Sequence, residues 1–466
     1  MSSILINSYK KFSNKNLFLT LIIIIGFLFR WSGIDNGYWY DEWSSFYYSN
    51  PNLNINQIYT KVLLEEGAQP LYFIISSKWN YIFGYSPEAL RYFSFTCGFL
   101  SIFLFLILLK EFRKNNTFIY IAVFLFSSNY FLVQFSQESR FYSLSLLFSI
   151  LNLIFFFRFL KKKKYSYYYI LSAILSLLTN IFFALIIFSQ LIFLLINKNR
   201  KFIYYISIIV LFFLYCIIDF QYINSIFKKS LTFNIQNTIN YQFLIGYYFN
   251  IFFGSFFLGG LILIFCFFYL KNVKKIINNN VLFCIISIII TYSLPTIYSL
   301  VKNPVLRPRY IIFIVPIIII YFSYIISTLD KKKIKNSIIV FITLFSMIIF
   351  FYSKPLIFKP DTKAALVVIN ESKNKFLFIE NSKKNYFNNY LLNSSLAKKL
   401  RINYINNYEI PNKDFFWEVC LNNPRFATNS KIDNKYCFLN PHYKSHQIFK
   451  IIRVPDYILI LYKKNI

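Results

Sequence analysis

The feature that most constrains this chain is a series of apolar runs of about 20 residues, because a helix of that length crosses a ~30 Å hydrocarbon layer. These runs recur from near the N-terminus to about residue 353. Only 15% of the 466 residues are charged, whereas a soluble domain carries about 25%. The sequence therefore predicts a polytopic α-helical membrane protein and excludes an ordinary soluble one.

The predicted spans follow from these runs. The run 166–197 is too long for one ordinary span and has basic residues at both ends, so we expect it to cross twice, with a turn near Thr179–Asn180. Together the runs predict about eleven spans. The remaining runs are each interpreted as one span: 17–34, 88–109, 117–135, 140–160, 202–220, 243–270, 281–300, 310–328 and 337–353.

The distribution of Lys and Arg predicts the orientation, since short cytoplasmic loops are enriched in these residues. Basic clusters such as Lys161–Lys164 and 331–335 all fall on one side of the predicted membrane, whereas most of the acids fall on the other. We therefore expect the N-terminus inside and the C-terminus outside. Topology accounts in this way for the formal net charge of +32, which gives no reason to expect a nucleic-acid partner.

The predicted membrane module covers residues 1–353, and its first outer loop covers residues 35–87. Segments 53–66 and 69–84 in that loop have apolar residues at near-helical spacing, but they are too short or too polar to span. Treating 69–84 as a span would also move every later lysine cluster to the outside. We therefore expect two amphipathic helices that lie on the outer surface.

The composition changes at about residue 354. Residues 354–466 are rich in Asn, Lys and Asp, and they contain short apolar runs at 375–380 and 457–464 with helical spacing at 386–400. This pattern predicts a small extracytoplasmic α/β domain. Cys420 and Cys437 lie in it and are predicted to pair, since disulfides form outside the cytoplasm.

The first candidate site is "GYWYDEWSSFYYS" in the first outer loop, where Asp41 and Glu42 lie between Tyr40 and Trp43. Aromatic faces stack on the apolar faces of sugars, and a partly desolvated carboxylate can act as a general base. Two catalytic carboxylates in a sugar pocket are therefore one interpretation. The alternative is an aromatic belt at the interface with two solvated acids.

The second candidate is "QFSQESRFYSLSLLF", at the outer start of the fourth predicted span. Gln137, Glu138, Arg140 and Tyr142 occur there within two turns of a helix that enters the bilayer. Polar groups at that depth are costly and mark functional sites. We therefore expect a substrate pocket here, in which Arg140 binds a phosphate group of the substrate. The alternative is that Arg140 anchors the helix end, with Glu138 as its partner.

The third candidate is "VKNPVLRPRYIIF", an outer loop with Lys302, Arg307 and Arg309. Cations at this level suit the phosphate of a lipid carrier, because Arg binds phosphate oxygens in a bidentate manner. Arg91, at the outer end of the second span, is a further phosphate candidate. The alternatives are contact with anionic lipid headgroups for the loop and snorkelling for Arg91.

Other common chemistries find little support. His442 and His446 have i, i+4 spacing, but no carboxylate cluster lies near them in the sequence, so surface residues are the simpler interpretation. With ten Gly in the chain, a glycine loop for a nucleotide pyrophosphate is not expected. No pattern of Ser, His and Asp for hydrolysis is visible.

Several motifs together resemble the membrane-embedded C-type glycosyltransferases over residues 15–330. The nearest types are the protein O-mannosyltransferases and the lipid A aminoarabinose transferases. The motifs, in chain order, are "YDEWS", "AQPLYFIISSKWNYIFG", "EALRYFS", "SQESRFYSLSLLFSILNL" and "RPRYIIFIVP".

By resemblance, Asp41 is the catalytic carboxylate with Glu42 as its neighbour, and Arg140 and Arg309 match family arginines. Two departures are visible: Gln69 precedes Pro70 where many relatives have His-Pro-Pro, and Tyr142 stands where several have an acid. These departures leave metal binding and the acceptor open. No cofactor is assigned, and the use of a divalent metal stays an open question.

The resemblance implies a sugar transferase of the cytoplasmic membrane. Its donor would be a polyprenyl-phosphate-linked sugar, and its acceptor a hydroxyl of a cell-surface glycan, a lipid or a protein at the outer face. Membrane lipids would be its other partners. The alternatives are an outer-face oligosaccharide polymerase and a flippase or transporter of lipid-linked sugars; the latter would more often show internal symmetry and charges near the bilayer midplane.

Overall fold

The computed structural model divides the chain into two compact units. The first comprises residues 1–34, 53–76 and 91–354, and the second comprises residues 35–52, 77–90 and 355–466. Residues 35–52 and 77–90 of the first loop belong to the second unit together with the C-terminal segment. The predicted division into two domains at residue 353 therefore stays a prediction. The structure describes residues 2–34, 38, 40–112, 115–197, 202–225, 278–301, 307–329, 332–352, 362–373, 376–378, 403–405, 414–421, 446–454 and 457–464.

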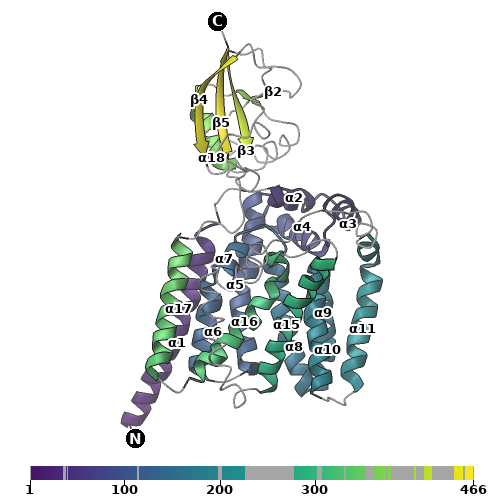
Figure 1. The fold of residues 1–466 in the computed structure, drawn as a ribbon, viewed down its shortest axis with the longest axis vertical. Helices are drawn as coiled ribbons and strands as arrows, with labels where there is room; N and C mark the ends of the chain where they lie inside the picture. Colours follow the sequence, from purple (N-terminus) through teal and green to yellow (C-terminus); the bar gives the residue numbers. More distant parts are fainter. Residues whose placement is uncertain are drawn as a thin grey trace. The chain divides into compact units, whose positions relative to one another are not determined.

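The first unit is built from long apolar helices (Figure 1). In chain order the described helices are α1 (Ser2–Trp31), α3 (Ile55–Lys61), the π-helical turn η1 (Val62–Glu66), α4 (Leu71–Phe83), α5 (Pro87–Phe112), α6 (Asn116–Ser128), α7 (Tyr130–Ser136), α8 (Tyr142–Lys161), η2 (Lys163–Tyr165), α9 (Ser166–Thr179), η3 (Ile181–Phe183), α10 (Ala184–Ile196), α11 (Phe202–Ile218), α15 (Asn279–Val301), η5 (Pro308–Ile314), α16 (Val315–Ser327) and α17 (Lys332–Tyr352). Three short helical segments, α3, η1 and α4, lie between the first long helix, α1, and the second, α5.

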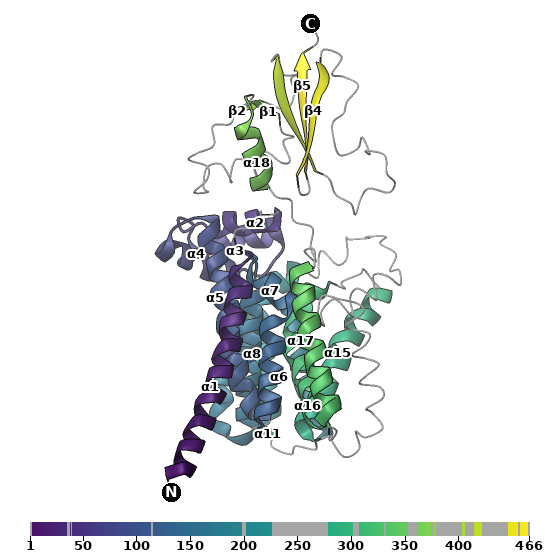
Figure 2. The ribbon, with the colours of Figure 1, turned by 90° about the vertical axis from the view of Figure 1, so that its left-hand side faces the viewer.

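The long helices pack in a connected series. Helix α9 packs against both α8 and α11, while α15 packs against α10 and α16. Helix α6 contacts α1, α16 and α17, and Figure 2 shows it between α1 and α17. Apolar side chains fill the contacts: every residue from Ile311 to Ile320 is buried. A chain with these helices is a polytopic membrane protein, as predicted.

Length and composition identify the spanning helices. Among the described residues, α5, α8, α15 and the segment Pro308–Ser327 are long and apolar enough to cross a membrane. The pair α6 and α7 would be a fifth span, bent by 51°. The predicted break in the run 166–197 is confirmed, because α9 ends at Thr179 and the Asn180 side chain caps η3. The predicted span 243–270 lies outside the described residues, so the number of spans and their orientation stay predictions.

The bend between α6 and α7 has a local cause. Asn129 has extended backbone angles, and its side-chain oxygen accepts from the Leu132 amide at 3.0 Å, so it ends one helix and caps the next. Arg30 of α1 is fully buried and donates to the Ser127 carbonyl oxygen at 2.9 Å. A cation at a helix C-terminus binds carbonyls that have no partner within the helix.

The two predicted amphipathic segments of the first loop are helical. Helix α3 begins with a capping box in which Asn54 and Gln57 bond each other's backbone, and Gly67 ends η1 with a φ of 64°. Helix α4 lies within the predicted range 69–84. Their position on a membrane surface stays a prediction.

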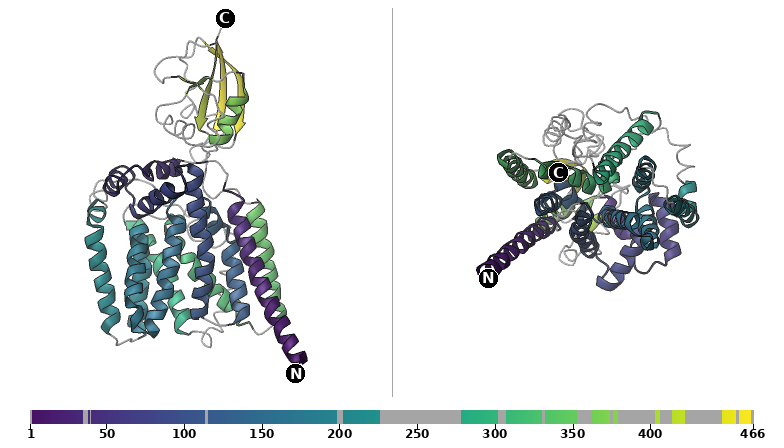
Figure 3. Two further views of the ribbon diagram at one scale, coloured as in Figure 1. Left: turned by 180° about the vertical axis from the view of Figure 1, so that it is seen from behind. Right: turned by 90° about the horizontal axis from the view of Figure 1, so that it is seen from below.

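The second unit combines α2 (Tyr40–Tyr48) and α18 (Thr362–Glu371) with a five-stranded sheet. In the sheet order β2-β1-β3-β5-β4, β1 is parallel to β2 and β3, and the other neighbours are antiparallel. Helix α18 packs against β5 (Figure 3). The strands are β1 (Phe376–Phe378), β2 (Asn403–Ile405), β3 (Phe415–Leu421), β4 (His446–Val454) and β5 (Tyr457–Lys464).

One hydrophobic core holds the second unit together. Trp43 and Phe46 of α2 belong to it with Leu366 of α18, Trp417 of β3 and Leu461 of β5. The strands predicted at 375–380 and 457–464 are confirmed by β1 and β5. The predicted helix 386–400, His442 and Cys437 lie outside the described residues, so the disulfide with Cys420 of β3 stays a prediction.

Candidate functional site

One end of the helical unit brings together segments that are far apart in sequence. The Asn180 side chain, between α9 and η3, donates to the Tyr310 carbonyl oxygen at 2.8 Å and to Ser145 Oγ at 3.3 Å. The Phe182 and Tyr310 rings stack with their centroids 5.2 Å apart. These contacts hold the start of η5 against the first turn of α8, so the second and third predicted clusters meet at this end.

An ion pair lies at this junction. Arg140, in the turn before α8, places Nη1 2.8 Å from Oε1 of Glu66, the last residue of η1. The two side chains are only 8% and 16% exposed. Sequence reasoning considered Glu138 as the partner of Arg140 and counted Glu66 merely as an outer acid. Glu66 therefore joins the candidate site as a residue that the sequence analysis missed.

Arg309 completes the described cationic part of the site. Its guanidinium carbon lies 5.8 Å from the ring centroid of Tyr142 and 5.8 Å from that of Tyr310. A cation–π contact attracts the guanidinium charge to the face of an aromatic ring. The charges of Arg140, Arg309 and Glu138 all act on the buried Tyr142 hydroxyl. This arrangement can bind an anion beside an aromatic wall.

Two predicted site residues contact the end of α1 instead. Gln137 donates from Nε2 to the Phe29 carbonyl oxygen at 2.8 Å, and the fully buried Arg91 donates from Nη1 to the Ile34 carbonyl oxygen at 2.8 Å. Phe29 lies in the last turn of α1 and Ile34 lies just after this helix, so both bonds fix the segment where α1 ends. Contact of Gln137 or Arg91 with a substrate stays a prediction.

A second polar cluster at the same end was not predicted. Gln69 donates to the Leu177 carbonyl oxygen, to the Tyr215 hydroxyl at 3.1 Å and to Asp219 Oδ2 at 3.4 Å. The Tyr215 hydroxyl also donates to Asp219 Oδ2 at 3.2 Å, and Tyr59 hydrogen-bonds the same carboxyl. Asp219 is 1% exposed. The available signal was Gln69 itself, one of the two departures noted from the resembled family.

The tandem acids lie in the second unit, where Asp41 and Glu42 form the first turn of α2. Acidic residues are favourable there because they complement the helix dipole. Asp41 is half-buried, whereas Glu42 is 1% exposed. Trp43 belongs to the core of the unit, so its ring packs against protein.

Hydrogen bonds and ring stacking fix the position of α2 within the second unit. The Asn80 side chain donates to the Ser49 carbonyl oxygen at 2.9 Å. The Tyr85 hydroxyl donates to the Phe46 carbonyl oxygen at 3.2 Å, and the Phe46 and Tyr85 rings stack with centroids 4.2 Å apart. The backbone that carries Asp41 is therefore held on a packed element.

The remaining predicted residues are placed less fully. Arg307 is exposed immediately before η5. Lys302 and the side chain of Tyr40 lie outside the described residues. Within the described part of the chain, no group of three His, Cys, Asp or Glu side chains could hold a metal ion.

Comparisons with known proteins address the family. Residues 68–219 match the family described as dolichyl-phosphate-mannose-protein mannosyltransferase. The fold is similar to that of ArnT from Cupriavidus metallidurans in the apo state, with a TM-score of 0.56 and 9% identity over 97% of this chain and 98% of that one. The resemblance to the membrane-embedded C-type glycosyltransferases is confirmed. ArnT bound to undecaprenyl phosphate gives a TM-score of 0.53 and 11% identity, over 96% of this chain and 97% of that one.

The likeness in fold to ArnT covers nearly the whole chain. Among curated proteins, none matches the sequence. The matched family segment contains Gln69, Arg140 and Asp219, whereas Asp41, Glu66 and Arg309 lie outside it. At such low identity the likeness to ArnT establishes the fold alone, so the roles of individual residues rest on their geometry and chemistry.

Proposed function

We propose that this chain is a glycosyltransferase that moves a sugar from a polyprenyl-phosphate carrier to an acceptor hydroxyl at the outer face of the cytoplasmic membrane. The observation that carries the proposal is the meeting of Arg140 and Arg309 at one end of a helical unit with the C-type fold. ArnT from Cupriavidus metallidurans binds undecaprenyl phosphate, a carrier of the same chemical class.

The cations would act on the leaving group. As the bond between the anomeric carbon and the phosphate oxygen breaks, its electron pair goes to the phosphate, and fixed cations stabilise that charge. Glu66 already neutralises part of the charge of Arg140. We assign the contacts to the phosphate to Arg140 and Arg309 together. Arg307, Lys302 and Arg91 are proposed as further cations near the carrier.

Asp41 would accept the proton of the attacking hydroxyl. The acceptor oxygen forms a bond to the anomeric carbon, and its proton passes to the Asp41 carboxylate. The support for this role is the family resemblance of the "YDEWS" motif and the fixed position of α2 within its unit. Glu42, which is buried, would orient the turn that carries Asp41. Gln137, Glu138 and Tyr142 are proposed to shape the sugar pocket, whereas a contribution of Tyr40 and Trp43 stays a prediction from the sequence.

The test is transfer from a panel of polyprenyl-phosphate sugars by the full-length protein in proteoliposomes. Asp41→Asn keeps the shape of the side chain but removes proton acceptance, so it should lower turnover on the order of 10²–10⁴-fold. Asp414→Asn is the matched control, because Asp414 is an exposed carboxylate in the same unit. Full activity of a well-folded Asp41→Asn protein would overturn the mechanism. Failure of the wild-type chain with every donor would overturn the function.

A further inference from the structure

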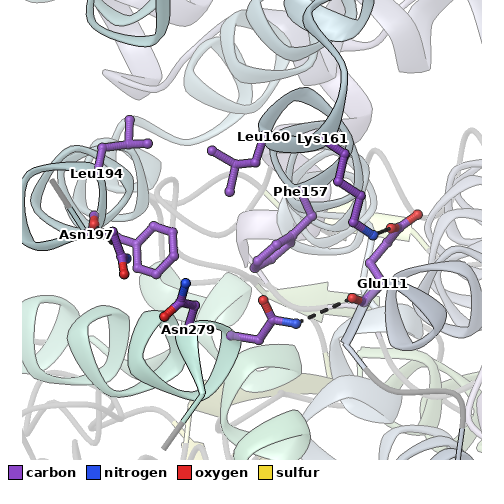
Figure 4. A pocket seen from close by; sticks show the side chains of 9 residues that line it. Glu111, Phe157, Leu160, Lys161, Leu194, Asn197 and Asn279 are labelled. Carbon is purple, nitrogen blue, oxygen red and sulfur yellow. Dashed lines mark hydrogen bonds and ion pairs between the residues drawn. The ribbon is translucent and has the colours of Figure 1, made fainter. Parts of the chain in front are cut away.

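A cavity lies at the other end of the helical unit from Arg140. Its volume is about 250 Å³, and it is formed where α5, α8 and α10 end and α15 begins (Figure 4). Figure 4 shows Phe157 and Leu160 on one side of the opening and Leu194 and Asn197 on the other, with Asn279 on α15. The lining residues are Glu111, Phe157, Leu160, Lys161, Phe193, Leu194, Asn197, Asn279 and Asn280.

Among the residues that the structure describes, the charged groups at the cavity leave an excess of one positive charge. The Glu111 carboxylate accepts hydrogen bonds from Arg158 Nε, at 3.1 Å, and from Lys161 Nζ. One carboxylate thus faces two cations. The Lys161 side chain is 59% exposed and can be reached from solvent, whereas the Glu111 side chain is only 14% exposed. An anion can therefore approach Lys161 without displacing the ion pair between Glu111 and Arg158.

Neutral donors line the same cavity. Asn279 and Asn280 form the first turn of α15, a 23-residue helix whose N-terminal end carries partial positive charge. The Asn278 side chain caps this end by accepting from the Val281 amide at 2.9 Å. Asn280 donates from its side chain to the Glu111 carbonyl oxygen at 3.4 Å, which ties α15 to the end of α5. Asn279 and Asn280 thus form the part of the cavity wall that comes from α15.

Apart from Asn197, the rest of the lining is apolar. Phe157, Phe193 and Leu194 are buried, and they form the part of the cavity wall from α8 and α10. A ligand with an anionic head and an apolar chain matches this division. Basic pockets between helix ends on the cytoplasmic side of membrane proteins bind such lipid headgroups.

We propose that this cavity binds the phosphodiester headgroup of an anionic phospholipid from the cytoplasmic leaflet. Lys161 and the first turn of α15 would contact the phosphate, and Phe157 and Leu194 would contact the start of an acyl chain. The site is separate from the transfer reaction and does not depend on it. Inorganic phosphate offers a similar anion without an acyl chain, so the experiment must distinguish a phospholipid headgroup from free phosphate.

The experiment measures lipid retention by native mass spectrometry. Full-length protein in detergent micelles is mixed with phosphatidylglycerol or with zwitterionic phosphatidylcholine. We expect the wild type to retain phosphatidylglycerol preferentially and Lys161→Gln to reduce that retention about fivefold, since one basic residue near a membrane surface contributes about this factor. Lys163→Gln is the matched control, because it removes the same charge from an exposed residue that does not line the cavity.

Two further arms make the outcome decisive. Lys161→Arg, which keeps the positive charge, should retain phosphatidylglycerol as the wild type does. Asn279→Leu should reduce the retention of phosphatidylglycerol although it changes no charge. Excess inorganic phosphate that displaces phosphatidylglycerol would show that the headgroup alone is recognised, whereas continued retention would show that the chain contributes. Equal losses in Lys161→Gln and Lys163→Gln, or no preference over phosphatidylcholine, would overturn the site.

Discussion

Arg140 Nη1 lies 2.8 Å from Glu66 Oε1, although 74 positions separate the two residues in the chain. The pair joins the end of η1 in the first loop to the turn that opens α8. Because both side chains are mostly buried, the ion pair fixes the direction of the Arg140 guanidinium as well as the position of the loop. Only the fold creates this relationship, since nothing in either local sequence specifies it.

Removal of the carboxylate should destabilise the fold. Glu66→Gln leaves Arg140 buried without that counter-charge, and we expect the free energy of unfolding to fall by about 2 kcal/mol, less than for a fully buried pair because of the partial exposure. Thermal unfolding in detergent measures the change. Glu65→Gln is the control, since Glu65 is its exposed neighbour. Equal shifts of Tm in the two variants would contradict the assignment.

The charge of Arg309 should matter less than its planar shape. Arg309→Lys keeps a cation but loses the planar fork of donors that contacts the Tyr142 ring. We expect the donor concentration for half-maximal transfer to rise about tenfold, the loss of one charged hydrogen bond, with a smaller effect on kcat. The measurement is a donor titration in proteoliposomes, with Lys333→Gln of α17 as an exposed control. An unchanged KM would exclude a phosphate contact.

The sequence was sufficient for elements whose limits depend on local chemistry. The break between α9 and α10 was predictable because the run 166–197 exceeds one span and contains Asn180, which caps the next helix. Strand β5 was predictable from a short apolar run with polar ends. In both cases the decisive residues are neighbours in the chain.

Contacts between distant segments could not be predicted in this way. The sequence marked Arg140 as a costly polar residue and Arg309 as a cation of an outer loop, but it did not identify Glu66 or the contact of Arg309 with Tyr142. Asp219 was counted only among the acids of the predicted outer side, and the structure buries it among hydroxyl and amide donors. A polar residue shows that a partner is needed, whereas only packing decides which partner is reached.

A close helix contact gives a prediction with an unusual sign. Gly98 of α5 faces α7, and a Cβ at this position would lie 2.5 Å from the Cβ of Ser136. Gly→Ala within a helix normally stabilises by roughly 0.5–1 kcal/mol, but here the clash should destabilise by about 1–3 kcal/mol. Thermal unfolding of Gly98→Ala checks the sign, and adding Ser136→Gly should recover part of the loss. A rise of Tm in Gly98→Ala would refute the close contact.

The core of the second unit should depend on Trp417. Its ring is 1% exposed, and its Nε1 donates to Ser372 Oγ at 2.9 Å. Trp417→Ala should cost about 3–5 kcal/mol and make the unit sensitive to limited proteolysis. Because Trp43 and Phe46 of α2 share this core, new cleavage should also appear beside α2. Phe449→Ala on β4, where the side chain is 58% exposed, should leave the cleavage pattern unchanged.

The orientation in the membrane yields the last prediction. Most Lys and Arg residues fall on one predicted side, which the positive-inside rule places in the cytoplasm. Leu64 is 71% exposed in η1 on the predicted outer side, and Lys163 is exposed in η2 on the predicted inner side. In a background without the native cysteines, an impermeant thiol reagent should label Leu64→Cys but not Lys163→Cys in intact cells. Permeabilised cells provide the control, because both positions should then react. Labelling of Lys163→Cys alone would invert the orientation, and with it the face of the membrane on which Arg140 and Arg309 meet the carrier.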